Sequence, residues 1–260
     1  MQAPFLKIET LNVGYKAGQE RKVVVGTINA TLRAGEVVAL IGLNGAGKST
    51  LLRTLSAFQP PLSGRVEFAK GDVANLSPAE LAKCVSVVLT ENNFATLTVS
   101  ELVALGRTPY TGFLGRLTSE DKTIVTAAME RMGIAHLAGR VVSTLSDGER
   151  QKCLIAKAIA QQTPLMLLDE PTAFLDFRSK VQLFRTLRAL ATDDGKAVVV
   201  STHDIEMALR FANKLWLICD GALYEGGAQQ LAANGLLQRF IDGDGIVYDK
   251  ENNRIDITQI

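Results

Sequence analysis

Short apolar segments alternate with longer segments of helical periodicity along much of the chain. Residues 35–42 (GEVVALIG), 165–169 (LMLLD) and 197–203 (AVVVSTH) predict buried strands. Residues 48–58 (KSTLLRTLSAF) and 177–191 (FRSKVQLFRTLRALA) instead have the spacing of amphipathic helices. This alternation of strands and helices indicates an α/β fold.

The two ends and the middle of the chain follow different patterns. Residues 5–13 and 23–32 predict an early antiparallel strand pair, and residues 246–258 predict a short hairpin. From about Thr98 to Gln161 the periodicity predicts helices joined only by turns. We therefore expect a single domain whose parts are a core and a helical insert, at residues 1–90 with 162–260 and about 91–161.

Composition narrows the class of protein. The 260 residues carry a net charge of +1 and no long basic tract, so nothing in the charge indicates nucleic acid as a partner. Three cysteines lie in apolar surroundings without paired spacing, which predicts buried reduced thiols rather than a zinc site. The N-terminus does not have the layout of a signal peptide, and there is no run of about 18 apolar residues. We expect a soluble protein.

A glycine-rich segment follows the first buried strand. Residues 42–50 (GLNGAGKST), called the cradle below, match the pattern G-x-x-x-x-G-K-[ST] between a strand and a helix. Glycines allow backbone N–H groups to converge on phosphate oxygens, and the helix N-terminus adds partial positive charge. Lys48 supplies a full charge toward the β- and γ-phosphates, and the Ser49 hydroxyl is placed to bind Mg²⁺. The segment predicts a nucleotide site.

Acidic and basic side chains follow two later strands. Asp169 and Glu170 end the apolar strand at 165–169, and His203 follows the strand at 197–203. Asp169 is placed to hold Mg²⁺, directly or through water. Glu170 can polarise an attacking water as a general base, and His203 is placed to contact the γ-phosphate and that water.

Residues 145–151 (LSDGERQ), called the signature segment below, resemble the signature motif of ATP-binding cassette (ABC) proteins. The cradle, the signature segment, LMLLDEP, PTAFLD and STHD also occur in the order found in that family. The resemblance implies a P-loop NTPase (RecA-like) core with an N-terminal antiparallel β subdomain and an inserted α-helical subdomain. It also implies binding of ATP with Mg²⁺. Tyr15 matches the aromatic that stacks on adenine, and the matching cradle positions are Gly42, Asn44, Gly45, Ala46, Gly47, Lys48, Ser49 and Thr50.

In the ABC family two such domains close head to tail around two ATP molecules. The resemblance implies that Ser146 and the backbone of Gly148 contact the γ-phosphate held by the other copy's cradle. A helix that begins near Ser146 could neutralise the side of the triphosphate that the cradle leaves open. Asp176 has two interpretations, either a position at the seam of this dimer or the N-cap of the following helix.

Two positions depart from the commonest pattern of the family. Asp147 replaces a glycine of the signature, and Glu149 stands where glutamine is frequent. A carboxylate about 4 Å from a phosphate costs on the order of 4 kcal/mol at an effective dielectric near 20, so we expect Asp147 to point away from the nucleotide. Glu91 aligns with a glutamine that contacts the metal and water in the family. Either Glu91 takes that catalytic and metal-binding role, or it is a solvated loop acid and the alignment is shifted.

The segment after residue 98 is similar to the subfamily that imports chelated iron, haem or cobalamin. The resemblance implies an ATP-hydrolysing subunit on the cytoplasmic face of a bacterial inner membrane. Its partners would be a second copy, separate transmembrane permease subunits and, indirectly, a substrate-binding protein. Residues Gly106 to Gly115 are candidates for docking the membrane subunits. The alternatives are a soluble ATP-driven clamp on nucleic acid or ribosomes, whose coiled coils or second cassette are missing here, and a regulatory module that has lost catalysis.

Overall fold

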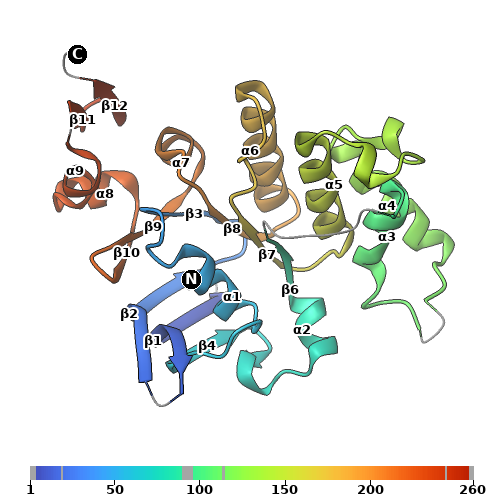
Figure 1. Cartoon of the computed structure of the whole chain (residues 1–260), viewed down its shortest axis with the longest axis horizontal. Coiled ribbons are helices and arrows are strands. Elements are labelled where there is room, and N and C mark those ends of the chain that lie inside the picture. The colour runs from blue at the N-terminus through green and yellow to red at the C-terminus, as the bar shows by residue number, and fades with distance from the viewer. Residues whose placement is uncertain (1–3, 19, 90–95, 113–114, 244, 258–260) are drawn as a thin grey trace.

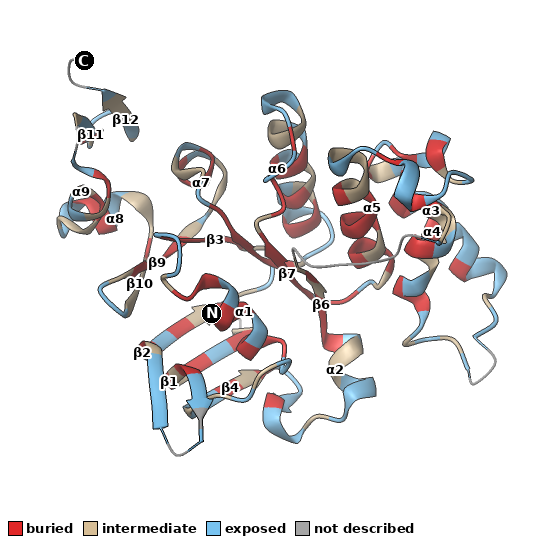
Figure 2. Cartoon of the chain, viewed as in Figure 1, coloured by how far each residue is buried: buried red, intermediate tan, exposed pale blue. Residues whose placement is uncertain are grey.

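Five parallel strands form the centre of the computed structural model, which describes residues 4–18, 20–89, 96–112, 115–243 and 245–257 (Figure 1). Most residues of these strands are buried, as expected for a parallel sheet with both faces covered (Figure 2). The predicted α/β fold is confirmed. In spatial order the strands are β9 (Lys214–Cys219), β3 (Val37–Gly42), β8 (Ala197–Ser201), β7 (Leu165–Asp169) and β6 (Val85–Val88).

An antiparallel lobe continues the sheet beyond β9. The predicted early strand pair is confirmed, since its two strands pair antiparallel along most of their length. The strands of the lobe are β10 (Ala222–Gly226), β2 (Glu20–Leu32), β1 (Leu6–Ala17), β4 (Ser63–Phe68) and β5 (Gly71–Asp72). Strand β10 of this lobe pairs antiparallel with the parallel strand β9 from Ala222 to Gly226 and joins β2 through a single parallel ladder pair, Ala222 with Gly26.

Alternate residues of the parallel strands face two different cores. On β7, Leu165 and Leu167 belong to a cluster that contains the buried leucines of helix α1 (Lys48–Leu55) and the inner face of the antiparallel lobe. Met166 and Leu168 belong to the opposite cluster. The period-2 direction of strand side chains explains this division. Helix α1, and with it the cradle, is therefore held between the two parts of the sheet.

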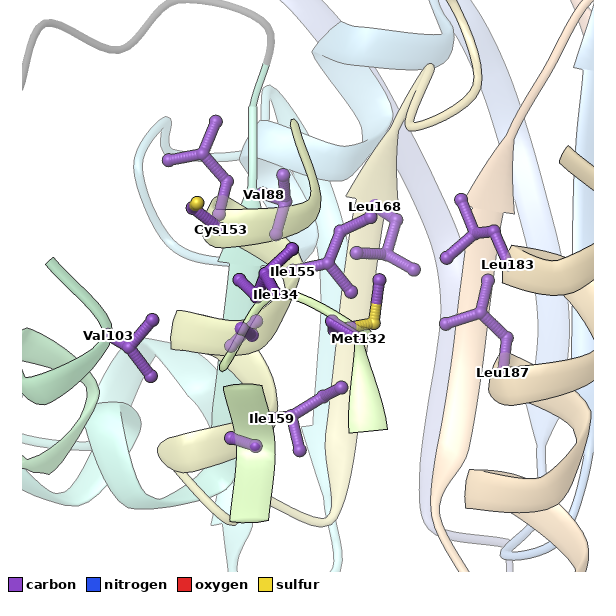
Figure 3. Close-up of a cluster of buried hydrophobic side chains, with 14 of the residues drawn as sticks. Val88, Val103, Met132, Ile134, Cys153, Ile155, Ile159, Leu168, Leu183 and Leu187 are labelled. Atoms are coloured by element: carbon purple, nitrogen blue, oxygen red, sulfur yellow. The ribbon is translucent and has the colours of Figure 1, made fainter. Parts of the chain in front are cut away.

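The cluster on the opposite face extends into the helical insert (Figure 3). Cys153 and Ile155 pack there with strand residues such as Leu168, so the insert shares a core with the sheet. The three helices predicted in this region are confirmed: α3 (Val99–Ala104), α4 (Ser119–Arg131) and α5 (Asp147–Ala160). Helices α6 (Phe177–Thr192) and α7 (Ile205–Phe211) also contribute to this cluster, whereas α2 (Pro78–Cys84) packs on the other face of the sheet through Cys84. Short 3₁₀ turns occur at Val73–Asn75, Leu105–Arg107, Ala135–Leu137 and Val142–Thr144.

The C-terminal segment lies at one end of the molecule (Figure 1). Helices α8 (Ala228–Ala233) and α9 (Leu236–Ile241) lead to the hairpin formed by β11 (Ile246–Asp249) and β12 (Arg254–Ile257). The predicted hairpin is confirmed. Tyr248 anchors it, because its buried ring belongs to the third hydrophobic cluster.

The three cysteines were expected to be buried, reduced thiols, and one of them is not buried. All three are free; Cys84 and Cys153 are buried, whereas Cys219 is partly exposed. Burial raises the pKa of the Cys153 thiol to about 12, so this thiol stays protonated and unreactive. Within the described residues, no helix has both the length and the apolar character needed to cross a membrane.

Candidate functional site

Three strands end at one edge of the parallel sheet and bring the predicted chemistry together. The ends of β3, β8 and β7 carry Gly42, Ser201 and Asp169. Asp169 pairs with Ser201 in the ladder, and Leu40 of β3 pairs with the same serine. Because parallel strands present their carboxyl ends at one edge, residues far apart in sequence meet there, as is usual for sites in open α/β sheets.

The cradle is a tight loop between β3 and α1. Gly45 and Gly47 have φ angles of 78° and 106°, in the left-handed region that favours glycine. A Cβ on Gly47 would also lie 2.7 Å from a methyl carbon of Val24, so a side chain has no room there. Lys48 is buried, and its Nζ donates to the carbonyl oxygens of Gly42 at 2.9 Å and Leu43 at 3.3 Å. The ammonium is thus fixed within the loop.

A cavity of about 620 Å³, the cradle hollow, opens above this loop. Its wall includes most of the predicted nucleotide-binding residues together with Glu170. Gly42 and Ala46 support the loop from within, where a Cβ on Gly42 would meet the Ala46 methyl at 3.3 Å. The predicted residues that line the hollow are Tyr15, Asn44, Gly45, Gly47, Lys48, Ser49 and Thr50.

Tyr15 reaches the cradle hollow from β1. Its ring is half-exposed, and its hydroxyl lies 2.8 Å from the Thr50 hydroxyl. Stacking of this ring on adenine stays a prediction. Strand β2 adds Lys22, Val23 and Val24 to the wall. The sequence analysis missed these three residues, because a strand pattern does not show which residues will lie beside a loop formed later in the chain.

Asp169 is held by a serine that the sequence analysis also missed. Asp169 is only 3% exposed, and its Oδ1 accepts a hydrogen bond of 2.6 Å from the Ser201 hydroxyl. The Ser201 oxygen in turn accepts the backbone N–H of Glu170 at 2.9 Å. One buried hydroxyl therefore orients both acidic positions. The only signal in the sequence was a polar residue at the end of an apolar strand.

Glu170 lies between two cationic or potentially cationic groups. One carboxylate oxygen is 3.8 Å from Lys48 Nζ, and the other is 2.8 Å from His203 Nδ1. The backbone of Glu170 has φ 47°, which is uncommon for a residue with a side chain and is typical of positions constrained by a site. The predicted catalytic residues Glu170 and His203 are therefore in direct contact.

The side chains at this edge fit a divalent cation of the Mg²⁺ type. Ser49 lines the cradle hollow, and Asp169 ends its strand beside Glu170. Hydroxyl and carboxylate oxygens are ligands that Mg²⁺ accepts, usually with substrate phosphates and water completing the shell. Among the described residues no group of three or more His, Cys, Asp or Glu could hold a metal ion by itself. Glu91, the other predicted ligand, lies outside the described residues.

The signature segment begins helix α5 with a complete capping box. Ser146 is the N-cap: its hydroxyl donates to the Glu149 carboxylate at 2.8 Å and accepts the Glu149 N–H at 3.3 Å. Hydrogen bonds from the Ser146 N–H and hydroxyl lower the pKa of Glu149, so this carboxylate is ionised at neutral pH. Glu149 thus has a structural role as the partner of Ser146. Asp147 is exposed and pairs with Arg150 at 3.1 Å.

A second cavity, the signature hollow, lies at the start of α5 and has a volume of about 410 Å³. It is lined by residues 146–149 and 174–176, together with Lys152 and Ser179. Asp176 Oδ1 accepts the Ser179 N–H at 2.7 Å, which confirms the N-cap interpretation for helix α6; its place at a dimer seam stays a prediction. This hydrogen bond from the Ser179 backbone lowers the pKa of Asp176.

The two hollows are separate within one chain. Among the described residues, none lines both of them. Helix α1, at the cradle, and helix α5, at the signature, stand well apart in Figure 1. A nucleotide in the cradle hollow of one chain therefore does not reach the signature hollow of the same chain.

Part of the predicted docking segment, Gly106 to Gly115, is not surface. Gly106 and Arg107 are buried, and a Cβ on Gly106 would lie 2.3 Å from the Lys157 carbonyl oxygen of α5. Arg107 donates to Asp121 at 2.8 Å and to the Ala160 carbonyl at 2.9 Å. The prediction is wrong for these two residues, because the glycine serves close packing between helices. Tyr110, at 40% exposed, remains available.

The sheet order, the cradle and the acids at its edge define a nucleotide-binding protein of the P-loop class. The model of the ABC transporter family matches residues 25–173, which is more than half of the chain. The chain therefore belongs to the ABC transporter family.

Three relatives show how far the likeness extends. An uncharacterised ABC transporter ATP-binding protein of Methanocaldococcus jannaschii is 45% identical over 82% of this chain and 72% of its own length. The iron(3+)-hydroxamate import ATP-binding protein of Bacillus subtilis is 34% identical over 96% of this chain and 92% of its own length. The cobalamin import ATP-binding protein of Halobacterium salinarum is 39% identical over 79% of this chain. The match covers 51% of the length of that relative.

Solved structures agree with the sequence relatives. A metal-chelate type ABC transporter in an inward-facing conformation superposes with a TM-score of 0.78 at 29% identity, covering 92% of this chain and 89% of that one. A dimeric ATP-binding cassette in a post-hydrolysis state with ADP and phosphate has a TM-score of 0.77 at 28% identity, covering 85% of this chain and 98% of that one. The chain is an ATP-binding and ATP-hydrolysing cassette.

Proposed function

We propose that this chain is the ATP-hydrolysing subunit of an importer for an iron chelate, haem or cobalamin. It works as a head-to-tail dimer on the cytoplasmic face of a bacterial inner membrane. Separate permease subunits carry the cargo, which a substrate-binding protein delivers from outside. Nucleic acid has no part in this function. The import activities named for the Bacillus and Halobacterium relatives and the metal-chelate transporter superposed on this fold support the proposal.

One observation carries the proposal for the dimer, namely that the cradle hollow and the signature hollow are separate in one chain. The cradle hollow presents the Lys48 ammonium and the Glu170 carboxylate to one side of a triphosphate. The signature hollow presents the N-terminus of a 14-residue helix, capped by Ser146, which favours an anion. A second copy places its signature hollow against this cradle, so that Ser146 and the Gly148 N–H contact the γ-phosphate.

Glu170 is the general base of the proposed reaction. Its carboxylate accepts a proton from the attacking water while Lys48, 3.8 Å away, balances charge on the β- and γ-phosphates. An ionised carboxylate only accepts hydrogen bonds, so His203 donates from Nδ1 to Glu170. A protonated His203 then also donates from Nε2 to the γ-phosphate, whereas a neutral ring only accepts from the water.

Ser49 and Asp169 would hold Mg²⁺, and Glu91 is a third proposed ligand and catalytic contact. When bound, the ion supplies positive charge that stabilises the phosphoryl group in transfer. Ser201 has a positioning role, because its hydroxyl fixes the Asp169 carboxylate and the Glu170 backbone together. Tyr15, on the wall of the cradle hollow, stacks on adenine.

Substitution of Glu170 tests the proposal. Glu170→Gln keeps the shape of the side chain and removes the base, so turnover should fall by at least about 100-fold while ATP binding persists. ATP should then hold the variant as a dimer, measured by sedimentation velocity with and without nucleotide. In the source cell, Glu170→Gln should fail to restore uptake of labelled ferric chelate, haem or cobalamin after deletion of the chain.

A matched control is Glu206→Gln, which changes an exposed acid in the first turn of α7. We expect this variant to retain both turnover and uptake. Unchanged turnover in Glu170→Gln would contradict the catalytic assignment. Normal uptake of all three cargo classes after deletion of the chain would contradict the transport assignment.

A further inference from the structure

The wall that β2 adds to the cradle hollow carries a lysine whose role has not been assigned. Lys22 is exposed and lines the hollow together with Tyr15 and Lys48. In the antiparallel ladder of β1 and β2, Lys22 is the direct partner of Tyr15, so the two side chains leave their strands on the same face. The lysine therefore stands beside the ring that is proposed to stack on adenine.

The strands fix the position of Lys22 relative to the cradle. On the face that carries Tyr15 and Lys22, the next ladder pair is Val13 with Val25, and both valines are buried. A Cβ on Gly47 of the cradle would lie 2.8 Å from a methyl carbon of Val25, so this face packs directly against the cradle. Two residues of a strand span about 7 Å. The backbone of Lys22 is thus held close enough for its long side chain to extend over the hollow.

Lys22 also determines the sign of the charge on the wall. Among the residues that the structure describes, the charged residues that line the hollow are Lys22, Lys48 and Glu170. Glu170 lies 3.8 Å from Lys48 Nζ and offsets its charge, so Lys22 supplies the net positive charge. Lys7 and Arg65 of the same lobe are paired with carboxylates, whereas Lys22 forms no ion pair with any described residue. Its ammonium is therefore available to an anionic ligand.

We propose that Lys22 is a nucleotide-binding residue whose ammonium pairs with the α-phosphate of ATP. This inference rests on the nucleotide site proposed above for the cradle hollow. In that site Lys48 and Glu170 lie at the terminal phosphates, and Tyr15 lies at adenine. The α-phosphate is the anionic group between these two ends, and a lysine ammonium is a compact charge with three donors that suits a phosphate oxygen.

A contact with the α-phosphate acts equally on ATP, on the transition state and on ADP, because this phosphate keeps its bonds while the γ-phosphoryl group is transferred. Such uniform binding changes KM and leaves kcat unchanged. Lys22→Met keeps the length of the side chain and removes the charge. It should raise the KM for ATP and the dissociation constant for ADP by the same factor, about fivefold, with kcat within about twofold. Phosphate release gives the kinetic constants, and calorimetry gives the ADP constant.

Ionic strength separates an ion pair from a polar contact with the ribose or the base. In about 0.5 M NaCl the Debye length is about 4 Å, so the difference in ADP affinity between wild type and Lys22→Met should shrink. Lys22→Arg should retain most of the affinity at low salt. A difference that stays constant with salt would overturn the ion pair. A loss several times larger for ATP than for ADP would place the contact at the terminal phosphates instead.

Lys16→Met is the matched control. Lys16 is an exposed lysine next to Tyr15 on β1; it pairs with Arg21 in the ladder, on the opposite face, and is not among the residues that line the hollow. The variant removes the same charge and should leave KM and the ADP constant unchanged. Equal losses in the two lysine variants would overturn the specific contact and leave the proposed function intact. If Lys48→Ala binds ADP as tightly as wild type, the proposed nucleotide site fails, and this inference fails with it.

Discussion

The cradle hollow and the signature hollow differ in how complete they are within one chain. Lys48 and Glu170 line the cradle hollow 3.8 Å apart, and His203 lies 2.8 Å from Glu170 beside it. Lys48 begins helix α1, and Glu170 and His203 follow the ends of β7 and β8. The signature hollow is exposed, and among the residues that the structure describes the Ser146 hydroxyl forms hydrogen bonds only with Glu149 of its own helix. These three side chains at the cradle hollow are therefore already in contact within one chain. The signature hollow offers an exposed surface without such contacts among its described lining residues.

This difference indicates where regulation of the reaction resides. Glu170 already contacts both Lys48 and His203 within one chain. If the proposed dimer is right, we expect turnover to depend on the arrival of the second surface rather than on assembly of these three side chains. The helical insert that carries the signature shares a hydrophobic core with the sheet, and the ion pair of Arg131 with Asp194 at 2.6 Å also joins it to the core of the domain. A change in the position of this insert would alter the signature hollow without disturbing the cradle.

The largest expected effect is a change in turnover when one chain carries a defect in the cradle hollow and a second chain carries a defect in the signature hollow. Lys48→Ala removes the cradle charge, and Ser146→Glu places a carboxylate where a phosphate should bind; each alone should reduce turnover by about 100-fold or more. An equal mixture of the two should recover about a quarter of the wild-type turnover, because half of the dimers are mixed and each keeps one intact pair of hollows. Steady-state phosphate release measures this recovery.

Loss of the Ser146 cap costs about 1 kcal/mol of stability, so the fold of that variant should be checked by thermal unfolding. The control is a chain that carries both Lys48→Ala and Ser146→Glu. Its dimers have no intact pair of hollows, so this variant should be inactive at every protein concentration. Activity in the mixture no higher than in its components would contradict the assignment of the two hollows to different copies.

A smaller effect is expected from the histidine beside the base. His203→Ala removes the group that contacts Glu170 and should lower kcat by about 100-fold or less, with little change in the affinity for ATP. The chain has one other histidine, His136, which is exposed and lies outside the cradle hollow. His136→Ala should retain turnover within about twofold. Equal losses in the two variants would remove His203 from the reaction.

The smallest expected effect is on the stability of the helical insert and involves the buried carboxylate of Asp121. The hydrogen bond from Arg107, with further hydrogen bonds from Thr118, lowers the pKa of Asp121 from 3.8 to about 2. Stability from this buried carboxylate is full above pH 3.8 and is lost as the pH falls toward 2, because the folded state then has to take up the proton. Asp121→Asn should lower Tm by several degrees at pH 7 and leave ATP binding intact.

Urea midpoints measured from pH 7 downward give the matching test. The difference between wild type and Asp121→Asn should narrow below pH 4, where the wild-type carboxylate begins to lose its advantage. Asp256→Asn, in a more exposed ion pair of the C-terminal hairpin, is the control and should change the midpoint little at any pH. A constant difference across the range would contradict the role of the Asp121 charge.

Much of the site could be predicted because its residues belong to short sequence patterns that can be recognised without the fold. The cradle pattern needs glycines at positions of positive φ, and Asp169 and Glu170 stand at the end of an apolar strand. Ser201 was missed because its partner Asp169 is 32 residues away. Lys22 was missed because it lies on β2 and lines the cradle hollow only through the fold. Strands β9 and β10 and helices α7 to α9 were also not predicted, since their short apolar runs fit either periodicity.

By itself the sequence determined the chemistry of each element, since hydrophobic period, glycine positions and strand-end acids depend on a few neighbouring residues. Only the tertiary structure decided which side chains meet: the Ser201 hydroxyl with both acids, Glu170 between Lys48 and His203, and Gly106 against α5. Those contacts depend on strand order and register, which join segments more than 30 residues apart and leave no local trace in the chain.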